Sequence, residues 1–135
     1  MIRPCFLVVD RETSTGISTR KLIIETAKFN VITAYSNDEA IETLQRFPNL
    51  DGVVTDAGMP GMPCDQIIPA FKAIRAGIPV IVICTPRDAP CRLADHTLDS
   101  FDPRQLLALL ETLHPQATKS IEKRNEDLEN EFFNS

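Results

Sequence analysis

The sequence lacks the patterns that mark membrane, secreted or nucleic-acid-binding proteins. No run approaches the roughly 18 apolar residues of a membrane span, and Met1-Ile2-Arg3-Pro4 is not followed by the hydrophobic stretch of a signal peptide. The 14 basic and 19 acidic residues give a net charge of −5, with neither a basic stripe nor a repeated aromatic pattern. We therefore expect a soluble, cytoplasmic protein that binds neither membranes nor nucleic acids.

The four cysteines also lack a recognisable spacing. Cys5, Cys64, Cys84 and Cys91 contain no CxxC pair, and a zinc set of Cys64, Cys84, Cys91 and His96 fits no tetrahedral pattern. Small thiols in or beside apolar runs are typical buried side chains in a reducing compartment. The sequence therefore predicts free thiols, and a thiol or redox sensor that uses Cys64, Cys84 or Cys91 is an alternative.

The chain of 135 residues suits one domain with a hydrophobic core. Its short apolar runs predict buried strands, which alternate with stretches of helical spacing. The expected strands are residues 5–9, 31–34, 52–55, 80–84 and, more weakly, 96–100. The expected helices are residues 14–29, 38–47, 66–76 and a last one that begins near 103.

Several residues mark where these helices begin and end. Ser36 and Glu39 have the spacing of a capping box at the start of the second helix, and Pro48 ends it. Gly77 is a stop signal after the third helix. Asp102 caps the last one.

Strands alternating with helices predict a doubly wound parallel sheet of about five strands in the order 2-1-3-4-5. Ligands bind such sheets at the carboxyl ends of the strands. Asp10 and Asp56 follow the first and third expected strands, which are neighbours in that order. We therefore expect both carboxylates in one crevice, beside the Gly- and Pro-rich loop that follows Asp56.

Three segments together resemble the receiver domain of bacterial response regulators. They are Phe6-Leu7-Val8-Val9-Asp10, Asp56 before Met59-Pro60-Gly61-Met62, and Ile78-Pro79-Val80-Ile81-Val82, and the similarity covers about residues 4–114. The resemblance implies a flavodoxin-like fold and a signalling role in a two-component system or phosphorelay, not an enzyme. It also implies that Asp56 accepts a phosphoryl group, with Mg²⁺, from a histidine kinase or phosphotransfer protein.

The residues expected around Asp56 depart from the family's pattern. Arg11 replaces the second acid beside Asp10, which leaves Asp10, Asp56 and the Gly58 carbonyl as a weakened magnesium site. Arg11 either pairs with Asp56 or points into solvent. The hydroxyl position of the family falls at Cys84, a weak donor, with Thr85 one residue further on.

The lysine that the family carries at the end of the fifth strand is Asp99 here, which reverses the charge. Pro86 and Pro90 lie in the short connection before that strand, so the fourth helix of the family is expected to be shortened or lost.

These departures predict a receiver-like domain in residues 1–115, followed by a charged tail or helix extension in 116–135. We expect impaired magnesium-dependent phosphorylation of Asp56 and signalling through protein–protein contacts, a homodimer included. The alternative is a functional receiver phosphorylated on Asp56. A small enzyme that uses Asp10 and Asp56 as acid and base would lack a Gly-rich phosphate motif and a nucleophile–base pair.

Overall fold

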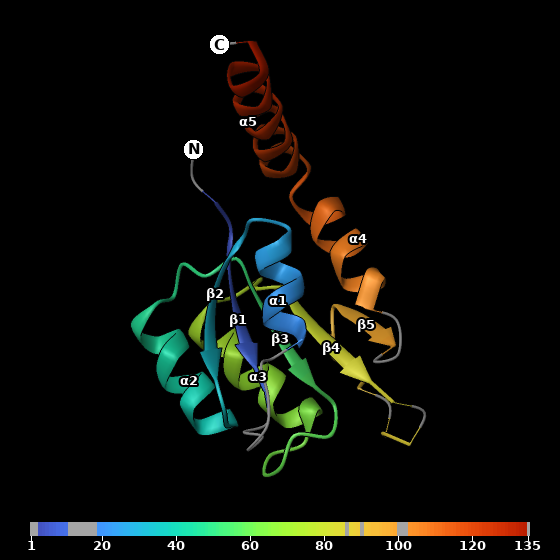
Figure 1. Cartoon of the computed structure of the whole chain (residues 1–135). Helices are drawn as coiled ribbons and strands as arrows, with labels where there is room; N and C mark the ends of the chain where they lie inside the picture. Colours follow the sequence, from blue (N-terminus) through green and yellow to red (C-terminus); the bar gives the residue numbers. More distant parts are fainter. Residues whose placement is uncertain (1–2, 11–18, 86, 90, 100–102, 135) are drawn as a thin grey trace.

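A computed structural model describes residues 3–10, 19–85, 87–89, 91–99 and 103–134 (Figure 1). Its five strands form one parallel sheet in the order β2-β1-β3-β4-β5, as predicted. The strands are β1 (Cys5–Val9), β2 (Asn30–Ala34), β3 (Gly52–Asp56), β4 (Val80–Cys84) and β5 (His96–Asp99). Each strand limit agrees with the prediction to within one residue, and residue 100 lies outside the described part of the chain.

The described helices are α1 (Thr19–Thr26), α2 (Asn37–Arg46), α3 (Cys64–Ile74), α4 (Pro103–Leu113) and α5 (Pro115–Asn134). Helix α1 ends before the predicted limit because Lys28 adopts a left-handed conformation, with φ of 65°. The predicted helix start at 14 and the cap at Asp102 lie outside the described residues. The predicted cap of α2 is confirmed, since the Glu39 amide donates to Ser36 Oγ at 3.1 Å.

Helices cover both faces of the sheet, and the strand side chains alternate between two hydrophobic clusters (Figure 1). Val9 and Val53 pack in the cluster with residues of α2 and α3. Val8 and Val54 pack in the other cluster, with Ile24 of α1 and residues of α4. Asp10 comes two residues after Val8, and Asp56 comes two residues after Val54. They therefore lie on the same side of the sheet as these valines, the side that α1 covers.

The connection from β4 to β5 contains turns and no helix among its described residues, in line with the predicted loss. Two carboxylates hold it in place. Asp65 of α3 accepts from the Leu93 amide at 3.0 Å. Asp95 accepts from the Val80 amide at 2.8 Å and from Lys72 Nζ at 2.9 Å.

Of the two alternatives for the tail, the structure has the helix. Ile121 of α5 is 4% exposed and packs in the α1–α4 cluster, so the first half of α5 belongs to the core. The His114 ring, between α4 and α5, meets Phe6 and Phe29 edge-on at 5.6 and 5.9 Å. Helix α5 then extends past the edge of the sheet where the N-terminus lies, opposite the carboxyl ends of β1 and β3 (Figure 1). In the described part of the chain, no helix combines the length and apolarity needed to cross a membrane.

We expect Asp95→Ala to lower the free energy of unfolding by about 1–3 kcal/mol, because it leaves the buried Val80 amide without its acceptor. Chemical denaturation measures the loss. Exposed Glu42 on α2 is the control, and Glu42→Ala should stay within about 0.5 kcal/mol of the unaltered protein. Equal effects of the two changes would contradict the assigned role of Asp95.

Asp95 also sets part of the acid limit of stability. Burial raises its pKa, but hydrogen bonds from Lys72 and Val80 and the charges of Lys72 and His96 outweigh burial and lower the pKa below its usual range. A carboxyl group whose pKa is lowered by folding stabilises the folded protein. This stabilisation is complete above the unfolded-state pKa and is lost as the pH falls through the folded-state pKa. As the pH falls through the folded-state pKa of Asp95, the free energy of unfolding of Asp95→Asn should therefore decrease less than that of the unaltered protein. Chemical denaturation at a series of pH values measures this difference.

Candidate functional site

The two predicted carboxylates meet, and an arginine joins them. Arg20 Nη1 lies 2.5 Å from Asp56 Oδ2, and Arg20 Nη2 lies 2.7 Å from Asp56 Oδ1. The same Nη1 lies 3.2 Å from Asp10 Oδ1. The three side chains are only 17–21% exposed, so solvent screens these ion pairs less than at an open surface.

The helix position of Arg20 explains this contact. Ile24, four residues further along α1, is fully buried in the cluster between α1, α4 and the sheet. Residues four apart share a helix face, so the burial of Ile24 turns Arg20 toward the sheet at the edge where Asp10 and Asp56 lie. The sequence patterns did not single out Arg20, and Arg11, the arginine expected near Asp56, lies outside the described residues. The available signal was the spacing between Arg20 and Ile24.

The residues do not fit a magnesium site while Arg20 holds this position. Mg²⁺ needs near-octahedral oxygen ligands, and the Asp10 and Asp56 carboxylates would be two of them. The guanidinium already donates to one oxygen of Asp10 and to both oxygens of Asp56. Gly58 lies in the turn two residues after Asp56, as the predicted site requires, but a fixed cation occupies the space between the two acids.

Cys84 lies close enough to Asp56 for the carboxylate charge to affect the pKa of its thiol. Burial raises the pKa of the Cys84 thiol, and the charges of Asp88 and Asp56 raise it further. The thiol is therefore less ionised than an ordinary cysteine near neutral pH. The Thr85 amide and hydroxyl lie 2.8 and 3.1 Å from Asp88 Oδ2, so the hydroxyl donates to a neighbour in its own loop.

Asp99 ends β5 and pairs with Cys84 in the parallel ladder. Its backbone amide donates to Gln105 Oε1 of α4 at 3.1 Å, and the residue is exposed. That Asp99 stands in place of the lysine of the resembled family stays a prediction.

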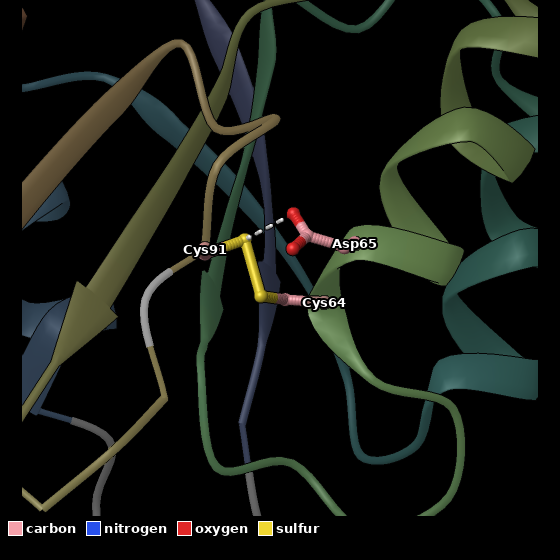
Figure 2. A group of neighbouring side chains, drawn as sticks. All are labelled: Cys64, Asp65 and Cys91. Atoms are coloured by element: carbon pink, nitrogen blue, oxygen red, sulfur yellow. Dashed lines mark hydrogen bonds between the residues drawn. A yellow bond between two sulfur atoms is a disulfide. The ribbon is translucent and has the colours of Figure 1, made fainter.

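The prediction of free thiols is confirmed for Cys5 and Cys84 and wrong for Cys64 and Cys91, which form a disulfide (Figure 2). Their Cα atoms are 6.0 Å apart, a normal separation for a disulfide. The two sulfurs meet because the first residue of α3 packs against the connection from β4 to β5. This pairing depends on tertiary contacts, and the spacing in the sequence does not reveal it.

The zinc set considered from the sequence does not form. His96 pairs with Ile81 in the ladder, three residues before Cys84, so the two side chains lie at different ends of the strand pair. Among the residues that the structure describes, the group that could hold a metal ion is Cys64, Asp65 and Cys91, whose ligand atoms lie within 4.8 Å of one another.

The chain matches no protein-family model and no curated protein, but it is similar to many solved structures. A response regulator receiver domain protein from Clostridium thermocellum is 26% identical with a TM-score of 0.69, and the match covers 93% of this chain and 98% of that one. The chemotaxis response regulator CheY4 of Vibrio cholerae is 22% identical with a TM-score of 0.67, covering 83% and 99%. A CheY-like receiver domain from Methylobacillus flagellatus is 18% identical with a TM-score of 0.71, covering 83% and 99%.

The sheet order and the two helical layers define a flavodoxin-like α/β protein. Within that class, the chain has the fold of the response regulator receiver domains to which it is similar. The fold agrees with the resemblance noted in the sequence.

The Arg20–Asp56 pair should contribute measurably to stability. In a double-mutant cycle of Arg20→Ala and Asp56→Ala, we expect a coupling energy of about 1–3 kcal/mol, because the pair is bidentate and partly buried. Lys21 and Glu25 on the same helix are the matched control. Their exposed pair at 3.9 Å should couple by less than about 0.5 kcal/mol. Equal couplings in the two cycles would contradict this structure of the site.

The thiol of Cys84 should react slowly with an alkylating agent near neutral pH, and Asp88→Asn should speed the reaction about two- to fivefold, because removing a negative charge lowers the thiol pKa. Mass spectrometry of the labelled peptides gives the rate. Cys5 is an internal control, because burial and the charge of Asp51 raise its pKa and Asp88 does not contribute. A rate at Cys84 that Asp88→Asn leaves unchanged would disprove the electrostatic cause.

Proposed function

We propose that this protein is an atypical receiver of the cytoplasm that signals through protein–protein contacts, with magnesium-dependent phosphorylation of Asp56 impaired. Its partner is a histidine kinase, a phosphotransfer protein or another signalling protein. The observation that carries this proposal is the contact of the Arg20 guanidinium with both oxygens of Asp56 and with Asp10.

The chemistry of phosphoryl transfer gives the reason. An acceptor carboxylate must present an oxygen in line with the leaving group, and cations must stabilise the charge on the transferring group. In this site Arg20 engages both acceptor oxygens, so a phosphoryl group can reach Asp56 only after that bidentate pair breaks. Asp99 adds a carboxylate at the strand end beside Cys84, where it repels an incoming phosphate.

Two exposed apolar side chains support a role in protein contacts. Met62 is 38% exposed and lies two residues before Cys64, and Leu93 is 48% exposed and lies two residues after Cys91. The disulfide thus links two segments that each present an apolar side chain to solvent. Methionine is enriched at protein–protein interfaces, whose cores are depleted of charged residues.

Incubation with acetyl phosphate and Mg²⁺, followed by intact-mass measurement, tests the proposal. We expect no gain of a phosphoryl group in the unaltered protein. The triple variant Arg20→Ala, Arg11→Asp, Asp99→Lys should gain one phosphoryl group, because it frees the acceptor and restores an acid and a cation. The same variant with Asp56→Ala added should gain none.

Magnesium binding is the second measurement. Titration calorimetry should detect no Mg²⁺ binding in the unaltered protein and measurable binding in Arg20→Ala, because the competing cation is gone. Lys21→Ala, which removes the neighbouring cation on α1, is the control and should leave Mg²⁺ binding unchanged.

The alternative function is a working receiver that is phosphorylated on Asp56. The observation in its favour is that Asp10 and Asp56 still meet at the carboxyl edge of the sheet. A phosphoryl group gained by the unaltered protein, and lost with Asp56→Ala, would establish this alternative and overturn the proposal.

A further inference from the structure

The Cys64–Cys91 disulfide joins two parts of the molecule that are 27 residues apart in the sequence. Cys64 is the first residue of α3, and Cys91 lies in the connection between β4 and β5, as Figure 2 shows. This connection has no helix among its described residues, so few backbone hydrogen bonds of its own hold it. The disulfide is a covalent cross-link between this connection and α3.

Asp65 gives the same connection a second attachment that does not need the disulfide. Its Oδ1 accepts from the Leu93 amide at 3.0 Å and lies 3.7 Å from Cys91 Sγ (Figure 2). When the disulfide is reduced, the Cys91 thiol can donate to this carboxylate, as thiols do to strong acceptors. The Cys91 sulfur is therefore bonded to Cys64 in the oxidised protein and can donate to Asp65 in the reduced protein. A reversible switch requires such favourable contacts in both states.

We propose that Cys64 and Cys91 are a reversible redox pair, and that their state controls how firmly the β4–β5 connection is held. The reactant is a low-molecular-weight disulfide of the glutathione type. Disulfides in a reducing compartment are typically transient and redox-sensing, and this pair has the position for that role. The inference does not depend on whether Asp56 is phosphorylated.

The exchange takes place in two steps. The Cys64 thiolate attacks one sulfur of the small disulfide, forms a mixed disulfide and releases one small thiolate. The Cys91 sulfur, after losing its proton to solvent, then attacks Cys64 Sγ and displaces the second small thiolate. The protein loses two electrons and two protons, and the small disulfide is reduced to two thiols.

The surroundings assign the first attack to Cys64. Its sulfur lies at the N-terminus of α3, where the helix dipole stabilises a thiolate. The Asp65 carboxylate lies within 4.8 Å of both sulfurs, so its charge does not distinguish them. Cys64 and Cys91 are only 8% and 7% exposed. We therefore expect exchange in minutes to hours rather than seconds.

The test equilibrates the full chain in mixtures of reduced and oxidised glutathione, then blocks thiols with an alkylating agent under denaturing conditions and counts labels by intact mass. The label count should change from four to two as the mixture becomes oxidising, because Cys5 and Cys84 stay free. For a two-electron exchange, the change from one-tenth to nine-tenths oxidised should span about an 80-fold range in the ratio of squared thiol to disulfide.

Two further measurements use the same samples. The oxidised protein should melt about 10 °C higher than the reduced protein, since the disulfide closes a loop of 27 residues. Hydrogen exchange at residues 91–95 should be slower in the oxidised form, with little change in β1 and β3. Cys64→Ser and Cys91→Ser should remove both differences, while Cys5→Ser and Cys84→Ser, which remove the free thiols, should keep them.

Several results would overturn the inference. One is a protein that keeps four labels at every glutathione ratio, and another is a native protein that keeps two labels in excess reductant, as a permanent structural disulfide would. A third is a reduced protein that retains one Zn²⁺ through Cys64, Asp65 and Cys91 and resists oxidation, which would make the group a metal site. Because no step uses a phosphodonor, these failures are separate from failure of the proposed function.

Discussion

The alternation of side chains along parallel strands is the constraint on which this structure depends. Successive residues point to opposite faces, so Val8 and Val54 fix the face on which Asp10 and Asp56 emerge two residues later. Helix α1 covers that face, and the burial of Ile24 sets the rotation of the helix about its axis. The contact of Arg20 with both acids follows from these two facts. The site is thus a product of core packing rather than of the loops alone.

A guanidinium and a metal ion can both neutralise paired carboxylates, but they differ in what controls them. Metal occupancy depends on concentration, whereas Arg20 is part of the chain and always charged. Arg20 thus supplies a positive charge to both carboxylates without a bound ion. The Cys64–Cys91 disulfide lies on the opposite face of the sheet, in the cluster with α2 and α3.

Local patterns in the sequence predicted most of the fold. The strand limits and the Ser36–Glu39 cap follow from hydrophobic periodicity and from short-range signals. The strand order follows from the connection rules of doubly wound parallel sheets. The contacts of Arg20 depend on how α1 is rotated against the sheet. Its partners Asp10 and Asp56 are 10 and 36 residues away in the sequence, so no local pattern predicts these contacts. The pairing of Cys64 with Cys91 likewise depends on how an irregular connection packs against α3. The pairing of Asp99 with Cys84 agrees with the sequence-based expectation that both residues end their strands.

Helix α5 is long relative to this small domain. Its 20 residues span about 30 Å, and its first half is anchored in the core through Ile121. Leu128, in the second half of the helix, is 53% exposed. A tilt of about 10° at its base would carry the far end through about 5 Å, by the geometry of a rigid helix.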